Sequence, residues 1–166
     1  MLQRRWFLAA GGALSLAGCG FQLRGTPELA FASLFVNVSE NSSLGNELKR
    51  NLASLGTVKI INPPAPQTDA QAVLDVLSDL REKTVVGVNA TGQVREFQLR
   101  VRIRFRLRTP QGKDLIPDTE LLQQRDISFN ESAVLAKEAE ESLLYRDMQS
   151  DLVQQLMRRL AAVRSL

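Results

Sequence analysis

The 166-residue sequence contains no histidine and only one cysteine, Cys19. Histidine is the commonest general base and the commonest metal ligand, so a catalytic site or a metal site in this chain would lack its most usual residue. One cysteine is too few for a cysteine-ligated zinc site. The acidic residues are spread over polar strand faces and a helix, and the glycine-rich stretch "GGALSLAG" lies near the N-terminus, away from any strand–helix turn that could hold a phosphate. We therefore predict a binding or scaffolding protein with no catalytic residues, no metal site and no cofactor.

The N-terminal stretch "MLQRRWFLAAGGALSLAGCG" has the layout of a secretory signal peptide. Two arginines precede an apolar run that is too short to span a membrane, and small residues come before the cysteine. The four residues "LAGC" resemble a bacterial lipobox, in which the cysteine becomes the lipidated first residue of the mature chain. We predict that residues 1–18 are removed and that Cys19 is lipidated. The alternative is a buried cysteine that follows an uncleaved anchor.

Lipidation of Cys19 would hold the protein to a membrane without a spanning helix, since each buried methylene contributes about 0.8 kcal/mol. The next residue is Gly20, not the aspartate associated with inner-membrane retention, which favours the outer membrane. Arg4 and Arg5 fit either general secretory or twin-arginine export. Removing 18 of the 166 residues leaves 148, enough for one domain, and takes away two arginines and no acid, so the formal charge falls from +3 to +1.

In the stretch "FQLRVRIRFRLRTP", residues 97–110, apolar residues fill every odd position from 97 to 107 and arginines fill every even position from 100 to 108. A period of two is typical of a β-strand with one buried face and one polar face. We therefore expect a row of guanidinium groups along one side of this strand. The row consists of Arg100, Arg102, Arg104, Arg106 and Arg108.

The remaining sequence alternates between strand and helix patterns. A strand, a helix of about three turns ending at Gly56 and a second short strand come first, with the spacing of a crossover between parallel strands. Three longer strands then form a meander, and the last segment, free of glycine and proline, is typical of one long amphipathic helix. Besides the arginine-rich strand, the expected strands are 31–38, 57–62, 72–88 and 115–130, and the expected helices are 44–55 and 132–164.

These elements predict an α+β fold. We expect a two-layer α/β sandwich, with two helices packed on one face of a mixed four- to five-stranded sheet. Residues 19–29 would form a tether and residues 30–166 a single domain. The helices would cover one sheet face and leave the arginine-lined face open to solvent or to a partner.

A short turn at "NATG" makes paired positions in the two flanking strands sum to 181. This register places Asp75 opposite Arg106 and Asp79 opposite Arg102, and "LIPDTE" brings Asp118 and Glu120 near the arginines of the row. Opposite charges across strands contribute about 0.2–1 kcal/mol each. One interpretation of the arginine row is therefore a solvated ladder of ion pairs without any ligand.

The same register places Arg81 opposite Arg100, where like charges are destabilising. A second interpretation is therefore an external anion bound near Arg81, Arg95 and Arg100. Nucleic acid is excluded as this anion because Phe97 and Phe105 point away from the arginines, so no aromatic stacking platform is available.

Three stretches resemble the family of LPS-assembly lipoproteins called LptE: "CGFQLRG", "GQVREFQLRV" and "LAKEAEESLLYRDMQSDLVQQLMRRL". The resemblance implies a two-layer α/β fold inside the lumen of the β-barrel protein LptD, a role as plug and assembly factor, and contact with lipopolysaccharide. It also implies a lipid-anchored location at the outer membrane, facing the periplasm and the barrel lumen. An envelope lipoprotein that binds a peptide or a glycan without LptD is the alternative.

The resemblance also implies which basic residues meet lipopolysaccharide. Relatives have a basic residue early in the C-terminal helix, where this sequence has Lys137. Where relatives have a basic residue in the turn before the arginine-rich strand, this chain has "NAT", so that contact is either absent or made by Arg95. Guanidinium groups bind phosphates and carboxylates through paired hydrogen bonds. The predicted lipopolysaccharide-binding residues are Arg95, Arg100, Lys137 and Arg81.

Overall fold

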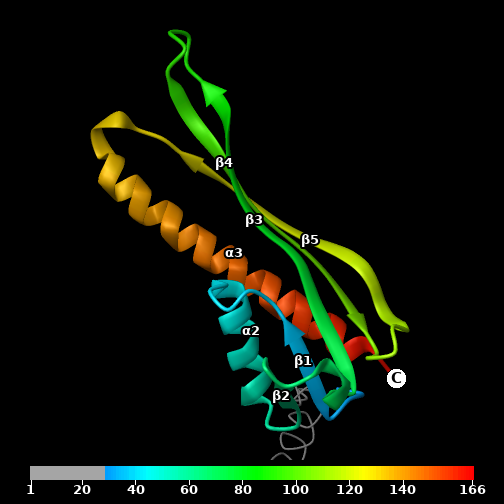
Figure 1. Cartoon of the computed structure of the whole chain (residues 1–166). Coiled ribbons are helices and arrows are strands. Elements are labelled where there is room, and N and C mark those ends of the chain that lie inside the picture. The colour runs from blue at the N-terminus through cyan, green and yellow to red at the C-terminus, as the bar shows by residue number, and fades with distance from the viewer. Residues whose placement is uncertain (1–28) are drawn as a thin grey trace, which may run out of the picture.

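The computed structural model describes residues 29–166, so Cys19, the expected signal peptide and most of the expected tether lie outside the described residues. The described chain forms one five-stranded sheet with two helices packed against it, as predicted (Figure 1). The strand order is β2-β1-β3-β4-β5. The elements are β1 Ser33–Asn37, α2 Ser43–Ser54, β2 Lys59–Ile61, β3 Ala72–Val88, β4 Val94–Arg108, β5 Asp114–Ser128 and α3 Val134–Ala162.

A side-chain cap marks the start of α2, whereas α3 begins without one. Ser42 caps α2 by accepting a hydrogen bond from the Gly45 N–H at 3.0 Å, and Gly56, with φ of 68°, follows its end. Helix α3 has 29 residues and begins two residues later than expected, because Glu131–Ala133 form a 3₁₀ turn. Its buried stripe, together with the leucines of α2, fills the space over the sheet. Within residues 29–166, no helix combines the length and the apolar character needed to span a membrane.

The sheet is mixed. Strand β1 runs parallel to both β2 and β3, as the strand–helix–strand pattern predicted, whereas β3, β4 and β5 form an antiparallel meander. The three meander strands have 17, 15 and 15 residues, well above the usual five or six. Their far ends therefore extend well beyond helix α2, and the turn between β3 and β4 projects beyond the first turn of α3 (Figure 1).

A β-bulge at Leu77 changes the faces of β3. Before the bulge, Asp75 lies opposite Arg106, as predicted; beyond it, Asp79 lies opposite Ile103, so the predicted Asp79–Arg102 pair is wrong. One extra residue shifts the side chains that follow to the other face of the sheet, here as far as Val85, after which the pairing is irregular again. The bulge therefore decides which charges of β3 face the helices and which face outward.

The same shift corrects the predicted clash between arginines. Arg81 lies opposite Val101 and turns toward the helices, and Glu82 lies opposite Arg100. Arg100 thus faces a carboxylate rather than a like charge. We expected Arg100 to bind an external anion because Arg81 would lie opposite it, and that pairing is wrong.

Candidate functional site

A small cleft lies between the first turns of α3 and the helix-facing side of the sheet, near the β3–β4 turn. We call it the tip cleft; its volume is about 230 Å³. Its lining combines four apolar side chains with two lysines, two glutamates and a serine. The apolar residues are Phe97 of β4, Ile127 of β5, Phe129 and Val134, the lysines are Lys83 of β3 and Lys137 of α3, and the others are Glu138 and Glu141 of α3 and Ser128 of β5.

Lys83 reaches the tip cleft because of the bulge. Its Nζ lies 4.3 Å from the centre of the Phe97 ring and 2.6 Å from Glu141 Oε2 on α3. A lysine over an aromatic face is held by attraction to the ring's π electrons. Without the bulge, Lys83 would lie on the outer face, which is why the sequence did not suggest it as a site residue.

Lys137 and Arg95 flank the same cleft. Lys137 Nζ donates to Ser128 Oγ at 3.0 Å and to Glu140 Oε2 at 2.8 Å. Arg95 is exposed, and its carbonyl accepts a hydrogen bond from the N–H of Phe129, a wall residue of the cleft, at 2.8 Å. Arg95 stands at an irregularity of the β3–β4 pairing, does not line the cleft, and donates from its Nη2 to Gln93 Oε1 at 3.5 Å. Of the four predicted binding residues, the structure therefore places Lys137 in the cleft and Arg95 next to one of its wall residues.

Arg81 also faces the helices but is engaged in packing them. Its Nη2 donates to Gln149 Oε1 at 2.6 Å and to Ser43 Oγ at 3.1 Å, and its guanidinium lies 5.6 Å from the centre of the Tyr145 ring. Gln149 is buried and also donates to Glu47 of α2 at 2.6 Å. Arg81 thus links β3 to both helices.

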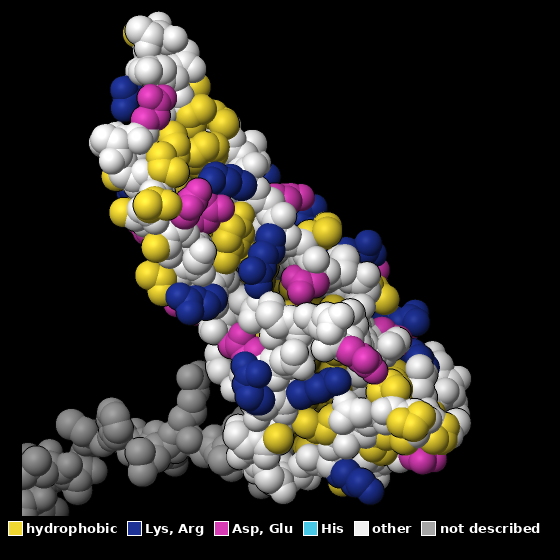
Figure 2. Space-filling view, turned by 60° about the vertical axis from the view of Figure 1, so that its left-hand side comes forward, with side chains coloured by type: hydrophobic (Ala, Val, Ile, Leu, Met, Phe, Trp, Pro, Cys, Tyr) yellow, Lys and Arg dark blue, Asp and Glu magenta, His cyan; other side chains and the backbone are white. Residues whose placement is uncertain are grey.

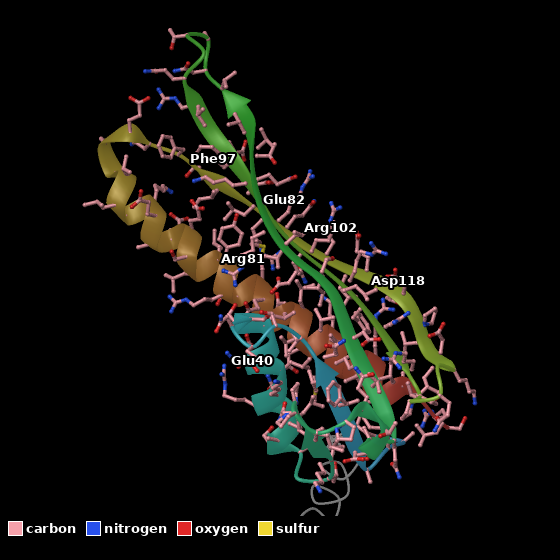
Figure 3. All side chains as sticks on the ribbon, in the orientation of Figure 1. Glu40, Arg81, Glu82, Phe97, Arg102 and Asp118 are labelled. Carbon is pink, nitrogen blue, oxygen red and sulfur yellow. The ribbon has the colours of Figure 1, made fainter. Side chains whose placement is uncertain are left out.

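Arg100 lies on the opposite face of the sheet. In Figure 3, Arg81 and Phe97 point toward α3, whereas Glu82 and Arg102 point away from it. Arg100 shares the outward face with Arg102, and its Nε donates to Gln98 Oε1 at 2.7 Å. The structure therefore separates Arg100 from the tip cleft.

The outward face carries the ion pairs expected for a charge ladder. Arg102 lies 3.9 Å from Glu82 and 3.7 Å from Glu120, and Arg104 binds Asp118. All of these side chains are substantially exposed, so each pair adds little to stability. A ladder without a ligand accounts for these arginines.

Asp75 is the exception, because only 3% of it is exposed. Its carboxylate accepts hydrogen bonds from Arg106 Nε at 2.9 Å, Arg108 Nε at 2.8 Å and Asn37 Nδ2 at 2.9 Å. Burial raises the pKa of Asp75, but the bonds from Arg108, Asn37 and Arg106 outweigh burial and hold this pKa below its usual value of 3.8. The network joins β1, β3 and β4.

A mixed sheet with two helices on one face, a paired-charge outer face and a partly apolar cleft with two lysines define an α+β binding protein. Among residues 29–166, no group of three or more acidic, cysteine or histidine residues could hold a metal ion. Figure 2 shows hydrophobic side chains gathered over the narrow end of the molecule, near the tip cleft.

Several known proteins are similar to this chain in both sequence and fold. The LPS-assembly lipoprotein LptE of Pectobacterium atrosepticum is 31% identical over 98% of this chain and 88% of its own. The solution structure of lipoprotein B from Nitrosomonas europaea has a TM-score of 0.73 and 32% identity, covering 86% of this chain and 91% of its own. The crystal structure of rare lipoprotein B from Shewanella oneidensis has a TM-score of 0.65 and 25% identity, covering 78% and 94%.

The family model for LptE, described as lipopolysaccharide-assembly, matches residues 31–160. The chain therefore belongs to the LptE family, whose members are assembly lipoproteins rather than enzymes. The resemblance found in the sequence, the expected class of function and the expected fold are confirmed.

Proposed function

We propose that this chain is an outer-membrane lipoprotein, anchored through lipid on Cys19, that plugs and helps to assemble an LptD β-barrel and binds lipopolysaccharide in transit. The chemistry of the tip cleft is the main observation that supports this proposal. Apolar walls beside Lys83 and Lys137, with Arg95 next to the wall residue Phe129, suit a ligand that is apolar in one part and anionic in another. Lipopolysaccharide, with acyl chains and phosphates, has this chemistry.

The outward face of the sheet supports the part of the proposal that concerns the barrel. It presents paired charges, with exposed Leu80 and Leu122 on either side of Arg102. The Nε of Arg102 is buried without a hydrogen-bond partner among the described residues, so this surface offers a partner protein both apolar contacts and a free donor. A barrel wall with acidic and apolar side chains would complement it.

Co-purification tests the barrel partner. A tagged copy of the full chain, extracted from native membranes with mild detergent, will retain a β-barrel protein through washing at high salt. Obligate interfaces are large and apolar, so they resist both salt and detergent better than transient ones. Recovery of the chain without any barrel protein, but with a peptide or glycan, would instead favour the alternative class of envelope lipoprotein.

Mass spectrometry tests the anchor. The mature protein will begin at Cys19 and carry acyl chains, and a Cys19→Ser variant will appear in the soluble fraction of the envelope because it lacks the buried methylenes that hold it to the bilayer. An unmodified Cys19, or a mature N-terminus elsewhere, would refute the prediction.

A further inference from the structure

The tip cleft has more apolar surface than a phosphate-binding site requires. Phosphate contacts need cationic and hydrogen-bonding groups, yet four of the nine lining residues are large and apolar. The apolar surface also continues outside the cleft, since Leu135 is 82% exposed and Val85, which pairs with Phe97 in the sheet, is exposed as well. Exposed apolar side chains next to an apolar cleft mark a site for an apolar ligand.

We propose that the tip cleft holds one acyl chain of lipopolysaccharide and that Lys83 binds an anionic group of the same molecule at its mouth. This inference rests on the proposed function and names the part of the lipid that the site takes. The chain would lie between Phe97 and Val134, with Lys83 and Lys137 beside the anionic groups.

The two lysines of the cleft stand beside Glu138 and Glu141, so the unused N–H donors of the lysines, rather than a net charge, favour this occupant over an uncharged one. An ammonium group has three N–H donors. Lys83 uses one of them on Glu141 and Lys137 uses two, on Ser128 and Glu140, among the residues that the structure describes. Donors therefore remain on both lysines, and the guanidinium of Arg95 adds more. The nearby carboxylates orient the lysines without using all of their donors.

The size of the cleft favours a single chain over a peptide helix. A helix binds in a groove through anchors at i, i+3, i+4 and i+7, which extend over about 10 Å. The tip cleft is one depression of about 230 Å³ between the start of α3 and the ends of β4 and β5. A flexible alkyl chain fits such a depression through its terminal methylenes.

Binding to the full lipidated chain in phosphatidylcholine discs tests the inference. The probes are lipopolysaccharide and the phosphorylated oligosaccharide left after its acyl chains are removed. Val134→Asn puts an uncharged polar side chain in the cleft wall at an exposed position that begins α3, so the fold is retained and the lysines gain no charged neighbour. We expect it to weaken lipopolysaccharide binding by about 60-fold, the equivalent of about three methylenes at about fourfold each. It will leave binding of the oligosaccharide unchanged.

Matched variants separate the two parts of the inference. Leu143→Asn adds the same polar group at a 52% exposed position of α3 outside the cleft and will change neither affinity. Lys83→Gln will weaken binding of both probes by about tenfold or more, the effect of losing a charge-assisted hydrogen bond.

Unchanged lipopolysaccharide binding in Val134→Asn would overturn the acyl-chain site while leaving the proposed function intact. Failure of the parent chain to bind lipopolysaccharide would overturn the proposed function itself. Equal competition by added anionic phospholipid would show that the cleft takes any lipid chain, against the assignment to lipopolysaccharide.

Discussion

Replacing Asp75 with asparagine will lower the free energy of unfolding by about 1.5–3 kcal/mol, the range for a lost hydrogen bond to a charged group. The carboxylate is buried and accepts hydrogen bonds from Arg106, Arg108 and Asn37. An asparagine has one acceptor oxygen in place of two and no charge, so the two arginines lose their ionic partner. Urea unfolding at neutral pH measures the change.

The pH dependence of this effect has a defined sign. The pKa of Asp75 is lower in the folded protein than its usual 3.8, so its contribution to stability is fully present above about pH 4 and is lost as the pH falls through the folded-state pKa. The difference in unfolding free energy between the parent and Asp75→Asn will therefore narrow below about pH 4. Asp79→Asn is the control, because Asp79 is exposed and only accepts from Ser42 Oγ at 3.4 Å. Equal losses in the two variants would show that the buried network is not the cause.

Much of the fold was predictable because its signals are local. The alternation in β4 is unbroken over 15 residues, and the leucine stripe of α3 recurs every four residues. The pairing of Asp75 with Arg106 followed from the turn and from matching apolar faces. These features depend on neighbours in the chain.

The bulge at Leu77 was not predictable in this way. Residues 74, 76 and 80 are apolar and fit a regular strand, yet the structure exposes Leu80 and turns Lys83 inward. Tertiary contacts favour this arrangement, because Gln149 of α3 accepts a hydrogen bond from Arg81 and Glu141 of the same helix forms an ion pair with Lys83. Partners some 60 residues away leave no trace in the local pattern of β3.

The candidate site was predictable only in part for the same reason. Lys137 came from a resemblance and Arg95 from its position near the turn, and both lie by the tip cleft. The cleft itself forms where Phe97, Phe129 and Val134 from separate segments meet. Local sequence patterns do not predict a cleft between separate elements, so only the structure identified Lys83 as a site residue.

Combining Arg95→Gln with Lys137→Gln will weaken lipopolysaccharide binding by about 100-fold or more. Each substitution removes a charge-assisted contact worth about 1.5–3 kcal/mol, or about 10- to 150-fold, and the two side chains flank one cleft, so their effects will not add fully. Neither residue is buried, so the melting temperature will hold within the small range usual for surface substitutions. Equilibrium binding at two salt concentrations measures the change, because the loss should be greater at low ionic strength.

Arg100→Gln and Arg104→Gln are the matched controls, since each removes one arginine from the outward face of the sheet. Arg104 serves an exposed ion pair with Asp118, so its loss should slightly lower thermal stability and leave lipopolysaccharide binding unchanged. Arg100 was itself predicted to bind lipopolysaccharide, but it lies across the sheet from the tip cleft and opposite Glu82. A ligand held in the cleft cannot reach it, so we now expect Arg100→Gln to bind as the parent does. A loss in Arg100→Gln that matches the loss in Lys137→Gln would move the headgroup site to the outward face.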